Sequence, residues 1–379
     1  MLVEDEGLAS TRVAETEHPP TSVIHRFACL DGLRGVAAIS VTIYHEALQF
    51  HSGLIGSAYL AVDFFFMLSG FVLCHAFQNR FSDGFGVIAY MKLRLIRLYP
   101  MYATGTFFLL LLAFLTSRFS LNDFIFSFLT ITLIMPTPSA FSLVKETSFF
   151  GLTDDLFPLN PPAWSLFYEL AANVVYALAA KSMSEKGLRN FLFLSLFALI
   201  LMIFYRGTVE FGFELSDFPS GAIRVSFSFA AGLSLFLAFQ KNAHGRAITW
   251  VPAIAPLTLL AALLLPDFGA DARAWYDIVM ITMAFPALIY VSAAIVPTRR
   301  ANKLCAFLGD MSYPLYAIHV PLIHWIRWIA NGSRLDTHAY WFQASTLVIL
   351  VALSYPASRY FDRPVRAWLN RRMTAGARA

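Results

Sequence analysis

Four ionisable side chains lie inside long apolar stretches of this sequence: His45, Asp63, Glu169 and His319. An ionisable group within a membrane span costs several kcal/mol and is therefore a candidate for function. A histidine oriented by a carboxylate can act as a general base. We therefore predict that His45 has a functional role. The simpler alternative is that each carboxylate pairs with an arginine or a histidine and only fixes helix packing.

The composition explains why these stretches are interpreted as membrane spans. Apolar residues form 58% and charged residues 14% of the 379 residues, against roughly 45–50% and 25% in soluble domains. The apolar stretches are about 20 residues long and are separated by short charged clusters. The sequence therefore predicts an all-α, polytopic helical bundle in a lipid bilayer. The net charge of +4 gives no reason to expect a nucleic-acid partner.

Basic loops indicate how the chain crosses the bilayer. Clusters at residues 80–97, 181–189, 241–246 and 299–303, together with the tail, predict cytoplasmic loops under the positive-inside rule. Residues 209–219 and 267–273 are acidic or weakly charged and are expected outside. Residues 121–135 form a short candidate span, which we interpret as re-entrant or interfacial. About ten spans result, with both termini in the cytoplasm.

The chain divides into three segments on these criteria. Residues 1–26 are acidic and lack an apolar core, which predicts a disordered cytoplasmic leader. Residues 27–368 form the membrane domain. Residues 369–379 form a basic cytoplasmic tail.

Depth and spacing group the candidate residues. At about 1.5 Å per residue, the four ionisable groups lie roughly 18–22 Å from the inner face, which predicts one shared polar cavity. Arg34 and His45 are eleven residues apart, about three turns, and so share a helix face. Arg34, with Arg94 and Arg97, forms a cationic cluster suited to phosphate groups. A simpler interpretation of Arg94 and Arg97 is that they obey the positive-inside rule.

The span that carries Glu169 has a polar stripe on an apolar helix. Ser165, Glu169 and Asn173 recur every four residues. Asn160 before two prolines predicts a helix N-cap at this point. Trp164 is either an interfacial anchor or part of a binding site.

Metal and disulfide chemistry are not expected. The sequence has no His-Glu-x-x-His or paired-cysteine motif, and His319 and His324 do not share a helix face well. The three cysteines, Cys29, Cys74 and Cys305, are interpreted as small packing residues.

Six motifs together resemble the acyltransferase 3 family of bacterial membrane O-acyltransferases. They are LDGLRG (30–35) followed by His45, FFFMLSGF (64–71), RLIRLYP (94–100), WSLFYE (164–169), LGDMSYPLY (308–316) followed by His319, and DRP (362–364). The arginine and histidine separated by ten residues are the most specific element. Asp362 stands where the family more often has glutamate.

The resemblance implies a fold, an activity and a location. It implies about ten spans in the bacterial inner membrane and transfer of an acyl group, commonly acetyl, from cytoplasmic acetyl-CoA or another acyl-CoA. The acceptor would be a hydroxyl of a glycan or glycolipid at the outer side. His45 would then be the catalytic histidine, and Arg34, Arg94 and Arg97 would bind the donor. We expect Glu169 or Asp63 to orient His45, with Glu169 paired to His45 or His319. We expect the substrate to contact Trp164, Ser165, Ser69, Tyr313 and His319.

Two other classes of protein remain possible interpretations. A proton-coupled or small-molecule transporter also places His, Asp and Glu near the bilayer midplane, but it has no need of the arginine cluster. A structural partner in polysaccharide assembly leaves the buried charges without a reason. The acceptor, the acyl chain length and the oligomeric state stay open. The sequence also leaves open whether His45 acts as a general base or carries the acyl group transiently.

Overall fold

The computed structural model describes residues 27–50, 56–116, 125, 134–136, 156–157, 160–242, 254–265, 269–333 and 335–376. All regular elements among these residues are helical, which confirms the all-α class. They are α1 (Ala28–Phe50), η1 (Ala58–Leu60), α2 (Ala61–Ser82), α3 (Val87–Thr116), α5 (Ala163–Ala179), α6 (Glu185–Arg206), α7 (Phe218–Asn242), α8 (Ile254–Leu263), α9 (Ala270–Val279), η2 (Met280–Ala284), α10 (Phe285–Ala293), α11 (Arg299–Gly332), α12 (Tyr340–Pro356), η3 (Ala357–Asp362) and α13 (Arg363–Gly376).

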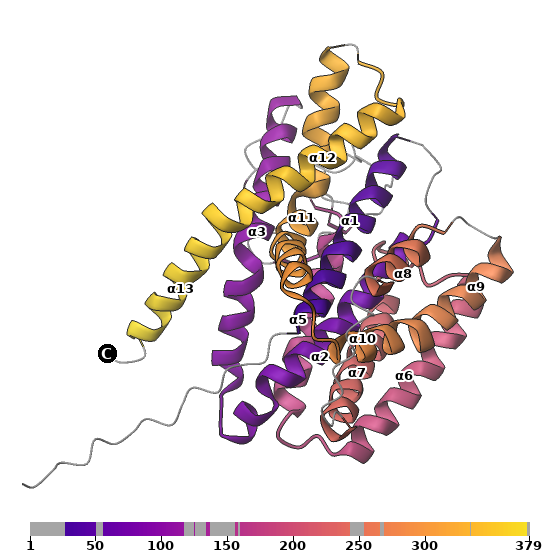
Figure 1. The fold of residues 1–379 in the computed structure, drawn as a ribbon, viewed down its shortest axis with the longest axis vertical. Helices are drawn as coiled ribbons and strands as arrows, with labels where there is room; N and C mark the ends of the chain where they lie inside the picture. The colour runs from indigo at the N-terminus through magenta and orange to yellow at the C-terminus, as the bar shows by residue number, and fades with distance from the viewer. Residues whose placement is uncertain are drawn as a thin grey trace, which may run out of the picture.

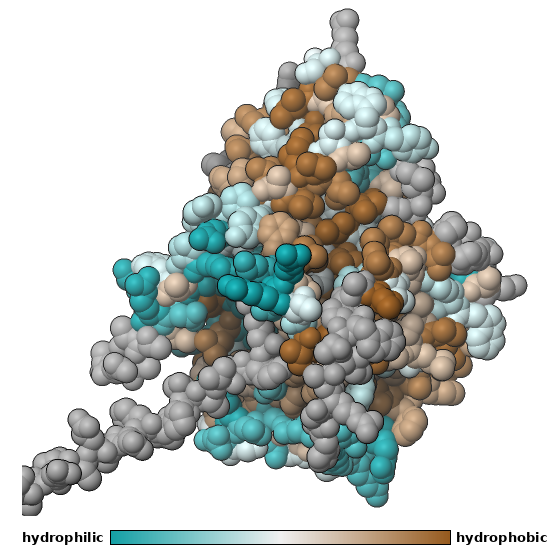
Figure 2. Space-filling view, viewed as in Figure 1, coloured by the Kyte–Doolittle hydropathy of each residue, from teal (hydrophilic) through white to brown (hydrophobic). Residues whose placement is uncertain are grey.

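Six segments of the described chain are long and apolar enough to cross a membrane: Ala58–Ser82, Val87–Thr116, Glu185–Arg206, Phe218–Asn242, Ala272–Ala293 and Tyr340–Met373. Apolar side chains cover much of the visible face of the bundle, and polar ones gather at its lower end and over α13 (Figure 2). A multi-pass membrane bundle is therefore supported. The count of ten spans and the orientation of the termini stay predictions. Most of residues 121–135, and all of the leader, lie outside the described residues.

The helices α1 and α11 form the centre of the bundle. The helix α11 packs against α1 on one side and α3 on the other, while α2 packs mainly against α7 (Figure 1). Glycines allow the close approach of α1 and α11, because a Cβ atom at Gly35 would lie 2.5 Å from the Cβ of Leu308. Small residues at such crossings are typical of membrane helices, where packing rather than the hydrophobic effect holds helices together.

The prolines of α11 leave backbone groups that side chains then satisfy. Pro321 has no N–H, so the carbonyl of Ala317, one turn earlier, lacks its usual helical partner. The side-chain amide of Asn160 donates to that carbonyl at 3.2 Å. The predicted N-cap role of Asn160 is therefore wrong: α5 begins at Ala163 without a side-chain cap, and Asn160 instead connects the start of α5 to α11.

Candidate active site

Three cavities follow one another through the bundle. The basic cavity is lined by Arg34, Arg97, Arg363 and Arg366, among others, and has a volume of about 430 Å³. The waist cavity shares Arg34 and Arg97 with it and measures only about 140 Å³. The histidine cavity, of about 540 Å³, is lined by His45, Tyr44, Trp164, Glu210 and Arg224, among others. Val62 and Tyr316 line both the waist and the histidine cavities, so the three cavities form a series.

Helix α1 places Arg34 and His45 at opposite ends of this series, and both side chains face α11. The Arg34 guanidinium donates to the Ser312 hydroxyl at 2.9 Å and to the Gly309 carbonyl at 3.0 Å. It also forms an ion pair with Asp31 at 3.1 Å. His45 contacts His319 of α11, with Nδ1 of His45 3.1 Å from Nε2 of His319. The prediction that Arg34 and His45 lie on the same face of their helix is therefore confirmed.

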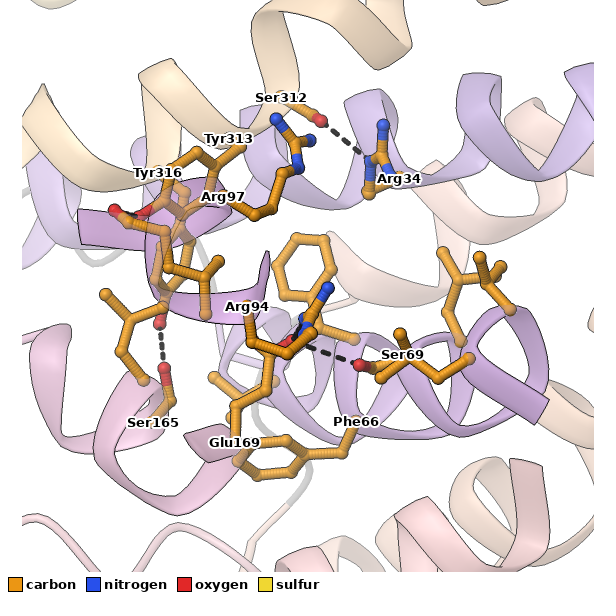
Figure 3. A pocket seen from close by; sticks show the side chains of 17 residues that line it. Arg34, Phe66, Ser69, Arg94, Arg97, Ser165, Glu169, Ser312, Tyr313 and Tyr316 are labelled. Atoms are coloured by element: carbon orange, nitrogen blue, oxygen red, sulfur yellow. Dashed lines mark hydrogen bonds and ion pairs between the residues drawn. The ribbon is translucent and has the colours of Figure 1, made fainter. Parts of the chain in front are cut away.

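Glu169 does not pair with either histidine. Its Oε1 accepts hydrogen bonds from Arg94 at 2.7 Å and from Ser69 at 3.0 Å, both in the waist cavity (Figure 3). Arg94, which lines the same cavity, supplies the positive charge that a partly buried carboxylate needs. The predicted contact of Glu169 with His45 or His319 is wrong, because α5 directs Glu169 towards α2 and α3.

Asp63 also forms an ion pair with an arginine. Both Asp63 and Arg224 are almost fully buried, at 0% and 1% exposure, and their side chains form an ion pair at 2.6 Å. Arg224 further donates to the carbonyls of Phe211 and Tyr59, at 2.9 Å and 3.4 Å. Asp63 thus locks α2 to α7, and the expectation that one cavity would hold all four ionisable residues is wrong.

The other predicted substrate contacts divide between the cavities. Ser69, Ser165 and Tyr313 line the waist cavity, whereas Trp164 lines the histidine cavity. Trp164 is 8% exposed and the Arg224 guanidinium lies 5.2 Å from its ring centre, so it faces the interior of the bundle. His319 is fully buried and contacts His45 rather than lining any of these three cavities.

Tyr316 separates the waist cavity from the histidine cavity. Its hydroxyl lies 2.6 Å from the Ser165 hydroxyl and donates to the Pro162 carbonyl at 3.1 Å. Figure 3 shows Tyr316 and Ser165 directed towards each other. Tyr316 belongs to the same motif as Tyr313, but a tyrosine in an apolar span gives no sequence signal that distinguishes a cavity wall from ordinary packing.

Arginines at the C-terminal end were missing from the predicted donor site. Arg363 pairs with Asp310, and Arg366 pairs with Asp362 at 2.7 Å. Arg97 lies 3.7 Å from the same Asp362 carboxylate. Arginines outnumber aspartates by two in the lining of the basic cavity. The DRP motif was a usable signal, because it is one of the six resemblance motifs and contains Arg363.

Arg224 was also overlooked, although the criterion used for Asp63 would have found it. It is an arginine within an apolar span, and such a charge requires a partner. The described residues contain no group of three or more His, Cys, Asp or Glu side chains that could hold a metal ion.

The chain is similar to known proteins over most of its length. A family model described as an acyltransferase domain matches residues 27–359. A Rhizobium radiobacter protein named protein 2 in picA locus is 35% identical over 200 residues, which cover 50% of this chain and 97% of that protein. The O-acetyltransferase OatA of Staphylococcus aureus is 23% identical over 362 residues, covering 89% of this chain and 57% of that protein. No solved structure matches the chain.

Proposed function

Because this chain belongs to the acyltransferase 3 family, we propose that it is a membrane O-acetyltransferase that transfers acetyl from acetyl-CoA to a hydroxyl of a carbohydrate acceptor. The family predicted from the motifs is confirmed by the match to residues 27–359, and with it the enzyme class, an acyltransferase. OatA carries the name O-acetyltransferase, which supports acetyl as the group transferred. The chain spans 57% of the length of OatA, so acceptor and partners belong to the proposal.

The observation that carries the proposal is the series of cavities with arginines at one end and a histidine at the other. Arg97, Arg363 and Arg366 line the wide basic cavity, where guanidinium groups suit the phosphates of a nucleotide. The waist cavity is too narrow for a nucleotide but suits an extended arm. Along α1, Arg34 and His45 are separated by about 16 Å, a span that such an arm bridges.

The waist cavity also offers a donor to an entering ligand. The Nε of Arg94 is buried and has no hydrogen-bond partner within the part of the chain that the structure describes. An unsatisfied buried donor is costly, and a carbonyl oxygen of the pantetheine arm would satisfy it. Glu169 holds Arg94 in place through its other nitrogen, at 2.7 Å. In this proposal Arg94 binds the pantetheine arm of the donor. Arg34, which lines both the basic and the waist cavity, aligns the donor.

His45 performs the proton transfer. It removes the proton of the acceptor hydroxyl while the hydroxyl oxygen forms a bond to the acetyl carbon. As the carbon–sulfur bond breaks, the imidazolium returns this proton to sulfur, so that a thiol and an O-acetyl ester result. The histidine cavity presents aromatic rings at Tyr44 and Trp164 and a carboxylate at Glu210, groups that suit the apolar faces and hydroxyls of a sugar.

The proposed setting is the bacterial inner membrane. The basic cavity faces the cytoplasm, as the positive-inside rule requires of the arginine-rich end, and the histidine cavity faces the outer side. Domain limits follow the sequence prediction, with a leader before residue 27 and a basic tail after residue 368. Neither the acyl chain length nor the acceptor among the surface glycans is specified by this arrangement.

The test compares glycan acetylation in cells and donor use by the purified protein. Mass spectrometry of surface glycans should show acetyl groups that are lost when the gene is deleted and in His45→Ala. The control His338→Ala, at an exposed loop residue, should retain them.

In nanodiscs, Arg366→Ala should raise the apparent KM for acetyl-CoA several-fold, whereas Arg189→Ala on the exposed face of α6 should not. Substrate movement without consumption of acetyl-CoA would indicate a transporter and refute the proposal.

A further inference from the structure

A second histidine contacts the catalytic candidate His45 from helix α11. Nε2 of His319 lies 3.1 Å from Nδ1 of His45, and the two ring centres are 4.9 Å apart. His319 is fully buried, whereas His45 is partly exposed to the histidine cavity. The carboxylates of Asp63 and Glu169, which the sequence suggested for this position, are paired with arginines instead.

Backbone carbonyls determine where each ring carries its proton. Nδ1 of His319 lies 2.8 Å from the Tyr316 carbonyl and 3.1 Å from the Leu315 carbonyl. A carbonyl oxygen can only accept, so Nδ1 of His319 is protonated. In the neutral ring Nε2 of His319 is then an acceptor, and it faces His45.

The same reasoning fixes the tautomer of His45. Its Nδ1 lies 2.9 Å from the Val41 carbonyl and 3.1 Å from Nε2 of His319. Both of these atoms are acceptors, so Nδ1 of His45 must carry the proton and share it between them. The lone pair of the neutral His45 ring is therefore on Nε2, the nitrogen that acts as the base in the proposed function.

We propose that His319 is the positioning residue that orients His45 and holds its proton on Nδ1, in the place that a carboxylate occupies in a catalytic triad. This proposal rests on the proposed acetyltransferase function. When His45 takes the hydroxyl proton on Nε2, its Nδ1–H becomes a stronger donor, and the lone pair of His319 stabilises the imidazolium. The proton leaves again to sulfur, so both rings finish neutral.

A histidine suits this position better than a carboxylate because of the surroundings. The pair is enclosed by α1 and α11, where an unpaired carboxylate would be costly to bury. A neutral imidazole offers the same acceptor without a resting charge. The cost is a weaker hold on the imidazolium, since a neutral acceptor hydrogen-bonds less strongly than an ionised one.

The proposal is tested first on the wild-type protein, and a variant serves only to assign its spectrum. The chain has 9 histidines, so ¹⁵N-histidine labelling in nanodiscs gives a readable spectrum, and subtracting the His45→Ala spectrum assigns His45. Long-range ¹⁵N–¹H correlations report which ring nitrogen is protonated. We expect the proton of His45 on Nδ1. Finding it on Nε2 would overturn the proposal, whatever the turnover.

Two variants separate positioning from packing. His319→Leu removes the acceptor and should lower kcat by about tenfold or more, a part of the 10²–10⁴-fold that general-base catalysis contributes, with the KM for acetyl-CoA unchanged. His319→Gln, whose amide oxygen can accept from Nδ1 of His45, should recover much of this loss. The control His324→Leu removes another buried histidine of α11 and should leave kcat unchanged.

Failure of this proposal differs from failure of the proposed function. Full kcat in His319→Leu, or no difference between the Leu and Gln variants at equal protein level, would remove His319 from a positioning role. Full turnover in His45→Ala would instead refute the catalytic role of His45. The tautomer measurement stays readable in both cases because it does not depend on turnover.

Discussion

The buried pair of Asp63 and Arg224 gives the sharpest test of which carboxylate is structural. The two side chains are 0% and 1% exposed and lie 2.6 Å apart. Removing one partner leaves the other charge buried and unpaired, which costs about 3–5 kcal/mol. At about 2 °C per kcal/mol, the lower end for large chains, Asp63→Asn and Arg224→Met should each lower the Tm by roughly 6–10 °C.

The double variant distinguishes a lost ion pair from general damage. Asp63→Asn combined with Arg224→Met removes both charges, so it should cost about 2–3 kcal/mol less than the two single changes together. Some loss remains, because the carbonyls of Phe211 and Tyr59 no longer receive hydrogen bonds from Arg224. The Tm is measured by thermal unfolding in detergent, and membrane levels are measured in parallel.

Two results would refute this reasoning. Strictly additive losses in the double variant would mean that Asp63 and Arg224 are not coupled. Alternatively, Asp63→Asn with a normal Tm but no acetyl transfer would mean that Asp63 acts in catalysis, as the sequence first suggested, rather than in holding α2 against α7.

Three further predictions address the waist, the topology and the helix packing. Glu169→Gln should retain the protein in the membrane but lower kcat/KM for acetyl-CoA about tenfold, because Arg94 loses its charged partner; unchanged donor kinetics would make Glu169 a packing residue. Cysteines introduced by Leu215→Cys and Glu185→Cys should react with an impermeant thiol reagent in intact cells only at 215, against a low background from the buried native cysteines; labelling at 185 would contradict the proposed topology. Gly232→Val should sharply reduce protein levels, because a Cβ there collides with the Met67 carbonyl oxygen of α2; normal accumulation would show that α2 and α7 can separate.

The placement of Arg34 and His45 on one face of α1 was predictable from the sequence. A helix fixes which residues share a face, so the eleven-residue spacing of Arg34 and His45 was enough to place both against one neighbour. That neighbour is α11, reached through Ser312 and His319. The helical class followed equally from composition, since a chain with few charged residues must bury its backbone polar groups in helices.

The partners of the buried carboxylates were not predictable. Depth estimates placed Asp63, Glu169 and His45 at one level, but depth says nothing about the direction in which a side chain points. The rotation of α5 about its axis turns Glu169 towards Arg94, and the crossing of α2 and α7 places Arg224 over Asp63. Both are set by helix packing.

Sequence alone therefore indicated the membrane environment of this protein, its helical class, its family and its candidate site residues. These depend on composition, on motifs and on spacing along single helices. Tertiary structure decided which groups meet. It assigned Glu169 and Asp63 to arginines, joined the C-terminal Arg363 and Arg366 to the cavity of Arg34, and placed His319 beside His45. The physical reason is that a contact between α1 and α11 joins residues 274 positions apart, and only the packing of whole helices brings such residues together.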